Sequence, residues 1–104
     1  MQDRDAAEAL AALGNTTRLK LFRLLVRAGN EGANVGQLQR NLEIPASTLA
    51  HHLSSLVRAG LVVQERQGRV VISRVDFRLT VGLVSYLTDE CCTGLKVERE
   101  EDAA

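Results

Sequence analysis

Apolar residues recur every three or four positions along most of the chain, and this spacing predicts a series of helices separated by short breaks. The clearest example is residues 44–63, which we expect to form a helix that turns directly into a strand. Pro45 suits its first turn, and Gly60 suits a C-terminal cap. The apolar stripe of this helix consists of Leu49, Leu53, Leu56 and Val57. The opposite face is small and polar, and consists of Ser47, Ala50, His51 and Ser54, which we expect to contact DNA together with Thr48.

Two helices are predicted at the start of the chain. Asp5 and Glu8 have the spacing of a capping box, and an Ala-rich helix follows them. The residues of this helix that we expect to face inward are Leu10 and Leu13. Asn15 is a good N-cap for a second helix over residues 16–28. The apolar side of the second helix consists of Leu19, Phe22, Leu25 and Val26, and its basic side of Lys20, Arg23 and Arg27.

A short third helix is predicted directly before the segment described first. Asn34 and Gln37 have the spacing of an N-cap and its reciprocal partner, and Leu38 and Leu42 would face the core. Only a few residues, including Pro45, separate this helix from the next one. Two helices so closely joined, the second with a small polar face, are typical of a helix-turn-helix arrangement, in which the second helix enters the major groove of DNA.

The residues after Gly60 predict a β-hairpin. Two β-branched runs, residues 61–67 and 69–75, flank a turn at Gln67 and Gly68. Arg66 and Arg69 lie near the tip of this hairpin, where they could reach a phosphate or the minor groove of DNA. We therefore expect the hairpin to act as a wing beside the helix-turn-helix.

A last helix is predicted over residues 77–92, with Asp76 as its N-cap. Its stripe consists of Leu79, Leu83, Val84 and Leu87. With Val81 added, the middle of this helix has little polar face and needs another surface to cover it, for which a second copy of the chain is the simplest candidate. The predicted order α-α-α-α-β-β-α is that of a winged helix-turn-helix domain, mainly α with a small β-hairpin. We assign this DNA-binding and dimerisation domain to residues 1–93, and a charged, disordered tail to residues 94–104.

The composition fits one small domain. The chain has 104 residues, of which 45% are hydrophobic and 3% aromatic, so the core should consist of Leu, Val and Ala. The N-terminus is acidic and lacks an apolar run, and no window is apolar enough to cross a membrane. We therefore expect a cytoplasmic protein without a membrane partner.

The net charge of zero conceals an uneven distribution. Residues 14–75 hold nine basic and three acidic side chains, whereas residues 1–13 and 76–104 both have an acidic excess. A basic central body with acidic ends is consistent with a middle region that faces phosphate. The basic side of the second helix is equally consistent with a solvated face.

Two strings, LGNTTRLKLFRLL and STLAHHLSSLVRAGLV, resemble the ArsR/SmtB family of bacterial metal-responsive repressors, and the resemblance covers roughly residues 8–90. The first string matches the family pattern through Arg18 and the leucines around it, and the second through His52, Leu53 and the Ala-Gly-Leu-Val end. Ala50 departs from the pattern, which usually has Ser at that position. The resemblance implies a homodimer, joined through its first and last helices, that binds an inverted-repeat operator and leaves it when an inducer binds.

The resemblance also suggests where the inducer binds. A family site in the third helix needs a C-x-C where this chain has Asn34, Val35 and Gly36. Another family site, on the last helix, uses Asp and His pairs, but here Arg78 and Asp89 replace the histidines. The only thiols in the chain are the adjacent Cys91 and Cys92. Some family members that respond to trivalent arsenic carry such a pair here, so the likeness favours that inducer.

The chemistry of two thiols narrows the choice of inducer. Thiolates select soft partners, and two of them without a nearby histidine are too few for a closed zinc site. Inorganic arsenite prefers a third sulfur, whereas monomethylated arsenite needs only two. We therefore rank methylarsenite ahead of arsenite and antimonite as the inducer, and expect no permanent cofactor. Because adjacent residues of a helix diverge, binding one atom requires the last turn to unwind or a sulfur from the other subunit.

Several alternatives stay open at this point. Cys91 and Cys92 could be small buried residues, or could sense redox state or reactive sulfur, although nearby acids and a helix C-terminus disfavour the thiolate. The whole chain could also be a winged-helix module used only for protein contacts. An enzyme is not expected, since no catalytic triad, paired carboxylates or phosphate-binding glycine loop is present. We expect His52 to make a structural hydrogen bond and His51 to face DNA.

Overall fold

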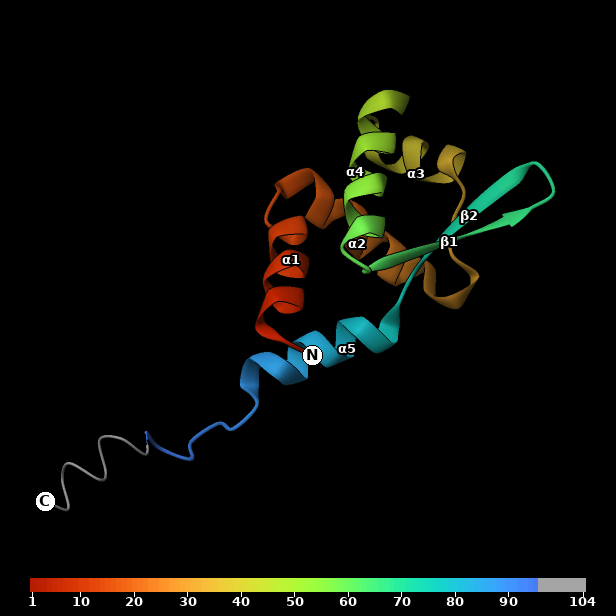
Figure 1. The fold of residues 1–104 in the computed structure, drawn as a ribbon. Coiled ribbons are helices and arrows are strands. Elements are labelled where there is room, and N and C mark those ends of the chain that lie inside the picture. Colours follow the sequence, from red (N-terminus) through yellow and green to blue (C-terminus); the bar gives the residue numbers. More distant parts are fainter. Residues whose placement is uncertain (96–104) are drawn as a thin grey trace, which may run out of the picture.

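The computed structural model describes residues 1–95, so the greater part of the predicted tail, residues 96–104, lies outside the described residues. The helices and strands follow the predicted order and form a winged helix-turn-helix (Figure 1). They are α1 (Asp3–Leu13), α2 (Thr16–Ala28), the 3-10 turn η1 (Gly29–Glu31), α3 (Val35–Leu42), α4 (Ala46–Arg58), β1 (Val62–Gln67), β2 (Val70–Val75) and α5 (Phe77–Thr88). None of the described helices is long and apolar enough to cross a membrane.

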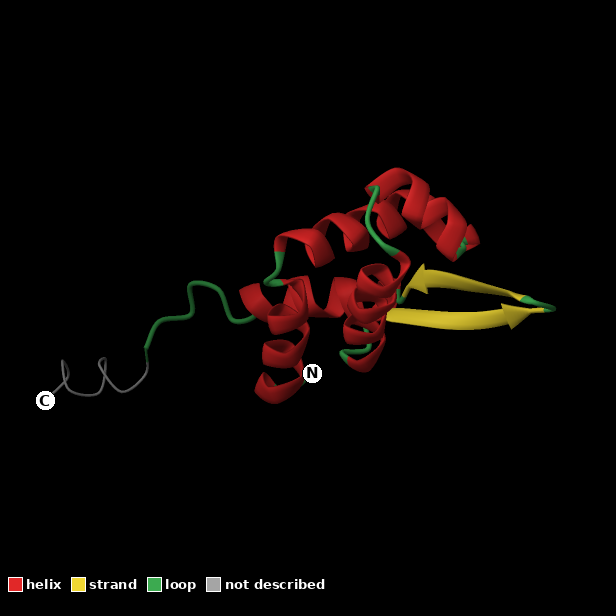
Figure 2. Ribbon diagram, turned by 90° about the horizontal axis from the view of Figure 1, so that it is seen from above, coloured by secondary structure: helices red, strands yellow, loops and turns green. Residues whose placement is uncertain are grey.

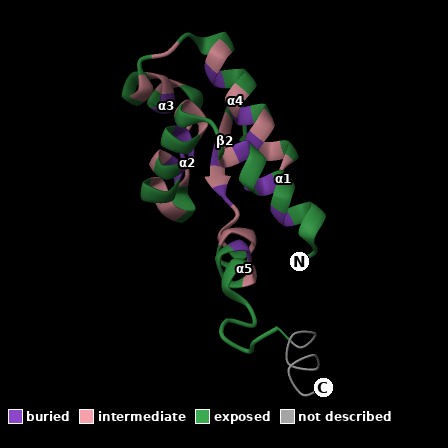
Figure 3. Ribbon diagram, turned by 90° about the vertical axis from the view of Figure 1, so that its left-hand side faces the viewer, coloured by how far each residue is buried: buried purple, intermediate pink, exposed green. Residues whose placement is uncertain are grey.

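Helices α2, α3 and α4 pack against one another and form the central unit of the domain. The hairpin β1–β2 follows α4 and extends away from the helices (Figure 2). Helix α1 contacts α2, α4 and α5, and lies on the opposite side of the domain from α3 (Figure 3). The fold therefore leaves α4 and the hairpin accessible, with α1 and α5 together at another side.

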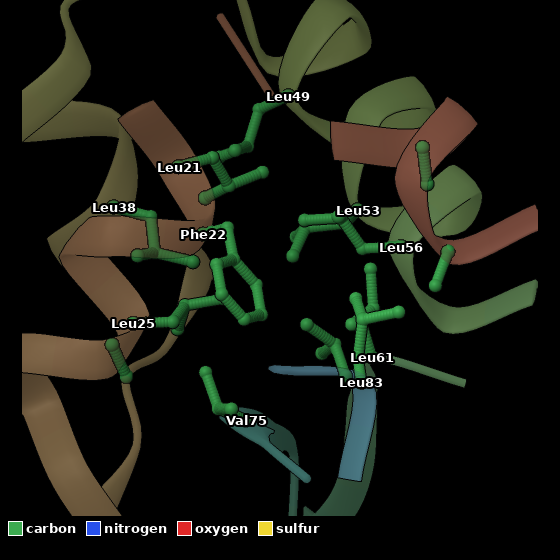
Figure 4. Packing of buried hydrophobic residues seen from close by; sticks show 14 of the residues in the cluster. Leu21, Phe22, Leu25, Leu38, Leu49, Leu53, Leu56, Leu61, Val75 and Leu83 are labelled. Carbon is green, nitrogen blue, oxygen red and sulfur yellow. The ribbon is translucent and has the colours of Figure 1, made fainter. Parts of the chain in front are cut away.

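A single apolar cluster holds these elements together. Leucines from α2, α3 and α4 point toward the ring of Phe22, and Val75 and Leu83 close the cluster from β2 and α5 (Figure 4). Among the described residues, the largest side chains that are essentially inaccessible to solvent are Leu21, Leu25, Leu38, Leu49, Leu56, Leu61, Val62 and Ser73. Burial of each leucine stabilises the fold by about 2 kcal/mol relative to an exposed position.

Three of the four predicted N-terminal caps are confirmed. Asn15 accepts a hydrogen bond from the backbone N–H of Arg18 at 3.0 Å. Asn34 and Gln37 form the reciprocal capping box of α3, with both hydrogen bonds at 2.9 Å. The carboxylate of Asp76 accepts from the N–H of Leu79 at 3.1 Å at the start of α5.

The fourth cap, at Asp5 and Glu8, is wrong because α1 begins earlier. Asp3 is already helical, and Gln2 precedes it without a side-chain cap. Asp3 and Asp5 lie instead in the first turn, where their negative charges interact favourably with the helix dipole.

The buried faces of α1 and α2 also differ from the prediction. Helix α1 buries three alanines, Ala6, Ala9 and Ala12, while Leu10 is exposed and Leu13 is half-buried. Small side chains allow α1 to approach its neighbours closely. Helix α2 carries two neighbouring apolar stripes, and its contacts with α4 and β2 bury Leu21, Phe22 and Leu25. The predicted inward residues Leu19 and Val26 lie at the exposed rim.

The hairpin is confirmed, but its turn lies one residue later than predicted. Gln67 pairs with Val70, so the two turn residues are Gly68 and Arg69, and Gly68 adopts a φ of +66°. At the base of the hairpin, Ala33 exchanges two backbone hydrogen bonds with Ser73, both of 2.9 Å. Gly32 makes this approach possible, since a Cβ there would lie 2.4 Å from the carbonyl oxygen of Ser73.

Helix α5 is shorter than predicted. It ends at Thr88 rather than at residue 92, so Cys91 and Cys92 lie in a turn beyond the helix. Glu90 and Cys92 both have a positive φ, of 62° and 70°, which is incompatible with a continuing α-helix. The expected last helical turn around the thiols is therefore absent.

Candidate functional site

A three-residue turn joins α3 to α4. Glu43 caps α3 in the left-handed conformation, with a φ of 53°, and donates its N–H to the carbonyl of Gln39 at 2.8 Å. Pro45 then precedes the first residue of α4, where its missing N–H costs no hydrogen bond. This turn fixes the angle between the two helices of the helix-turn-helix.

The outer face of α4 has the character that the sequence predicted. Its inner side is anchored by Leu49, Leu53 and Leu56, all of which are buried. Of the predicted outer residues, Thr48 is half-buried and sits at the edge of the face. The fully exposed ones are Ser47, Ala50, His51 and Ser54. The structure thus brings four small or polar side chains together on one accessible helix face.

His52 occupies a different position from its neighbour His51. A guanidinium nitrogen of Arg18 lies 3.4 Å from Nδ1 of His52, and Nε of Arg18 donates to the carbonyl of Ala12 at 2.6 Å. Arg18 therefore links the end of α1 to the middle of α4. Partial burial, followed by the charges of Arg18 and His51, lowers the pKa of His52, so the neutral ring that can accept a hydrogen bond is favoured.

This link was only partly foreseen. The structural role of His52 was predicted, but its partner was not, because 34 residues separate Arg18 from it. The available signal was the occurrence of both residues in the two strings that resemble the ArsR/SmtB family.

The two arginines predicted at the wing are accessible. Arg66 is exposed on β1, and Arg69 is exposed in the turn itself. The neighbouring Arg74 instead pairs with Glu65 across the hairpin at 2.9 Å, which is the one salt bridge within residues 1–95. Arg66 and Arg69 therefore keep their positive charges free of acidic partners among those residues.

The thiols of Cys91 and Cys92 are both exposed, so the alternative that they are buried core residues is wrong. The N–H of Cys91 donates to the carbonyl of Thr88 at 3.1 Å, which ties the turn to the end of α5. The interaction of its side chain with the thiol of Cys92, followed by some desolvation, raises the pKa of Cys91. The two thiols are therefore close enough to interact within this turn.

The turn after α5 provides two sulfur ligands, from Cys91 and Cys92, for a metal or metalloid. Nowhere among the described residues do three or more His, Cys, Asp or Glu side chains come together as potential ligands. Any further ligand at the thiol pair would come from the bound species, from solvent or from another subunit.

One side of α5 is apolar and uncovered. The exposed fractions of Val81, Val84 and Leu87 are 62%, 61% and 57%. Leu10 is also exposed on the neighbouring α1, and the hydroxyl of Tyr86 donates to the carboxylate of Asp3, which ties the two helices together. The need for a covering surface, predicted from the sequence, is thus visible in the structure.

Comparison with known proteins agrees with this architecture. A family model described as a helix-turn-helix domain matches residues 13–65, about half of the chain, from the end of α1 into β1. A protein of Methanocaldococcus jannaschii, described as an uncharacterized HTH-type transcriptional regulator, is 38% identical over 63 residues, which are 61% of this chain and 68% of that protein.

A second relative carries a more specific name. A protein of Halobacterium salinarum, named as an arsenical resistance operon repressor, ArsR, is 40% identical over 60 residues. The aligned part is 58% of this chain but 46% of that protein, so this chain spans about half of the relative's length.

A solved structure shares both fold and sequence features. It is described as the homodimeric winged helix-turn-helix DNA-binding domain of a protein from Mycobacterium bovis, and superposes with a TM-score of 0.63 at 25% identity, covering 88% of this chain and 91% of that one. From the matched model, these relatives and the winged helix-turn-helix fold, the chain belongs to the helix-turn-helix domain family and, within it, to the winged-helix regulators of the ArsR family.

Proposed function

We propose that the chain is a transcriptional repressor that binds an inverted-repeat operator as a homodimer and leaves it when a trivalent arsenical binds Cys91 and Cys92. The observation that carries the sensing part is the pair of adjacent, exposed thiols in the turn directly after α5. The repressor name of the Halobacterium salinarum relative supports the regulatory part.

Operator binding would use α4 and the wing. Ser47 and Thr48, near the start of α4, are suited to phosphate oxygens, and His51 and Ser54 can form hydrogen bonds with base edges. Ala50 lets the helix approach the floor of the major groove. On the wing, the free charges of Arg66 and Arg69 suit the backbone or the minor groove.

The dimer would form through α1 and α5. The exposed apolar face of α5 supplies a surface of the kind found in permanent interfaces, and the Mycobacterium bovis neighbour is described as homodimeric. A two-fold axis at this side would place the two α4 helices in successive major grooves, about 34 Å apart.

The inducer would react with the thiols by exchange of arsenic–oxygen for arsenic–sulfur bonds. Methylarsenous acid has two hydroxyl groups and one methyl group on arsenic. Each thiol of Cys91 and Cys92 displaces one hydroxyl, two As–S bonds form, and two water molecules leave. Because Cys91 and Cys92 lie in a turn beyond the helix, they are not held in the diverging directions of adjacent helical residues, and binding one arsenic atom would not require α5 to unwind.

Release would follow from the position of this turn. The turn is hydrogen-bonded to Thr88, and Tyr86, two residues before Thr88, contacts α1. Closing a ring through arsenic fixes the thiols in one geometry, which changes how the end of α5 packs in the dimer. A change in dimer packing alters the spacing of the two α4 helices, so the affinity for the operator falls.

The binding step can be tested by mass spectrometry of the intact protein. With methylarsenite, each wild-type subunit should gain one methylarsenic group and lose two protons, whereas Cys91→Ser and Cys92→Ser should gain no stable adduct. A wild-type protein that instead forms a disulfide or persulfide, and takes up no arsenical, would favour the alternative of a redox or reactive-sulfur sensor.

The DNA-binding step needs a separate measurement. Fluorescence anisotropy with a labelled inverted repeat, selected from random duplexes, should show binding that weakens steeply as salt increases. Negligible binding at low salt would favour the remaining alternative, a winged-helix module that only contacts proteins.

A further inference from the structure

A basic groove lies between α2 and α3, on residues that the proposed operator contacts do not use. A hollow of about 390 Å³ is lined by Lys20, Arg23 and Arg27 of α2, together with Leu24, Val26, Asn41 and Leu42. An adjoining hollow of about 280 Å³ shares Leu24, Arg27 and Asn41 with the first, and continues to Gly32 and Gln37. The two form one groove along the pair of helices, which we call the α2–α3 groove.

Within the described part of the chain, the cations of the α2–α3 groove have no acidic partner. Lys20, Arg23 and Arg27 are spaced by three and four residues, so they lie on one side of α2. The helix contains no acidic residue, and the single salt bridge among residues 1–95 is on the hairpin. Three like charges on adjacent turns repel one another, and a bound polyanion would relieve this repulsion.

In the proposed dimer, the α2–α3 groove of each subunit lies far from the two-fold axis. Helix α3 lies on the side of the domain opposite α1 (Figure 3). A dimer that joins α1 and α5 therefore has its α2–α3 grooves at its two outer ends. Arg40 is exposed on α3 and lines, together with Glu43, a separate hollow beside the α3–α4 turn, which therefore holds one charge of each sign and is not part of the α2–α3 groove.

We propose that the α2–α3 groove binds the phosphodiester backbone of duplex DNA that continues outward beyond each operator half-site. The groove offers charges and amide groups but no built set of base-reading side chains, so the contact is independent of sequence. The inference rests on the proposed operator binding, to which it adds a second, flanking contact that widens the footprint of each subunit. A solvated face or an acidic protein partner would leave the flanking DNA without effect.

The contribution of the α2–α3 groove to DNA binding can be distinguished from that of the rest of the interface with two duplexes. The short duplex contains the two half-sites alone, and the long duplex extends about one helical turn, about 10 base pairs, past each half-site. The affinity of the wild-type protein is measured for both duplexes over a range of salt concentrations. We expect a steeper salt dependence on the long duplex, by about 0.9 in the log–log slope for each added phosphate contact.

A variant without the three charges then tests whether the α2–α3 groove causes the difference in salt dependence between the two duplexes. The triple variant Lys20→Gln, Arg23→Gln, Arg27→Gln should match the wild type on the short duplex and lose the added slope on the long one. Because each phosphate contact is worth about 3.5-fold in affinity over a fourfold change in salt, the loss is measurable. The charge-conserving variant Lys20→Arg, Arg23→Lys, Arg27→Lys is the matched control and should keep the wild-type slope.

The proposal would be overturned if the affinity of the wild type depended equally on salt for both duplexes. It would also be overturned if the neutral triple variant kept the steeper salt dependence on the long duplex. Failure of the wild type to bind the short duplex at low salt would instead contradict the proposed function. The three side chains are exposed and their neutral replacements favour helix, so the thermal midpoint of the triple variant should stay near that of the wild type.

Discussion

His52 is a positioning residue of α4 rather than part of its outer face. Its Nδ1 faces Arg18, and Arg18 also binds the carbonyl of Ala12. An arginine can only donate hydrogen bonds, so this contact requires the neutral imidazole. Protonation of His52 would remove its acceptor and place two cations against each other.

The pH dependence of stability should reflect this arrangement. The pKa of His52 in the folded protein lies below the ordinary value of 6.5, so the unfolded chain binds a proton more readily. The contribution of His52 to stability is therefore fully present above pH 6.5, and is lost as the pH falls from 6.5 toward the lowered pKa. Urea unfolding should show that the free energy of unfolding falls more between pH 7.5 and pH 5.5 in the wild type than in His52→Asn. The asparagine side chain keeps a hydrogen-bond acceptor but does not titrate. An equal drop in both proteins would contradict the assigned role.

At the scale of single residues, the sequence predicted roles that depend on near neighbours but not roles that depend on distant parts of the chain. The caps at Asn15, Asn34 and Asp76 depend on neighbours three residues away, so local spacing was sufficient. Gly32 could not be interpreted in this way, because its need for a missing Cβ arises from Ser73, far along the chain. The exposure of Cys91 and Cys92 was equally hidden, since burial depends on which elements pack nearby.

At the scale of elements, α4 and α5 show why one boundary was predictable and another was not. Helix α4 has a proline before its first residue and a glycine after its end, both of which act locally. The apolar pattern of α5 continues past Thr88 in the sequence, but the helix stops there. Asp89 and Glu90 provide a signal that the periodicity overlooked, since negative charges are unfavourable at the C-terminal end of a helix dipole.

The exposed face of α4 can be tested with one substitution. Ala50→Glu introduces a carboxylate at the centre of this face, where a phosphate-lined groove would repel it, and operator affinity should fall at least about tenfold, or about 1.4 kcal/mol. Glutamate is a good helix former, so thermal stability should change by less than about 0.5 kcal/mol. Asn30→Glu, on the exposed η1 turn, adds the same charge elsewhere and serves as the control in anisotropy and thermal unfolding measurements.

At the scale of the whole molecule, the order of elements and the uncovered side of α5 followed from the sequence. Residue spacing was sufficient for the order, because each helix has its own break or cap. The faces of α1 and α2 were harder to predict, since Leu10, Leu19 and Val26 continue an apolar pattern but lie outside the single cluster that the chain can build. Part of what periodicity assigned to the core is therefore surface in one copy of the chain.

Dimerisation should depend on that surface. Val84→Glu places a charge in the exposed apolar face of α5, and sedimentation at micromolar concentration should show a shift from dimer to monomer, because an unpaired charge is costly to bury. Val63→Glu is the matched control, since Val63 is also an exposed valine but lies on the hairpin. A dimer that persists in Val84→Glu, or dissociates equally in both variants, would place the interface elsewhere.

The most direct test of the account is a titration of the preformed operator complex with methylarsenite, arsenite, antimonite, zinc and cadmium. Fluorescence anisotropy should show release of wild-type protein by methylarsenite at about one equivalent per subunit, at lower concentration than by arsenite or antimonite, and no release by zinc. Cys91→Ser and Cys92→Ser should bind the operator as the wild type does and stay bound when methylarsenite is added. Release of the wild type by zinc but not by any arsenical, or release of the two serine variants at the wild-type concentration, would contradict the assignment of Cys91 and Cys92 as the sensor.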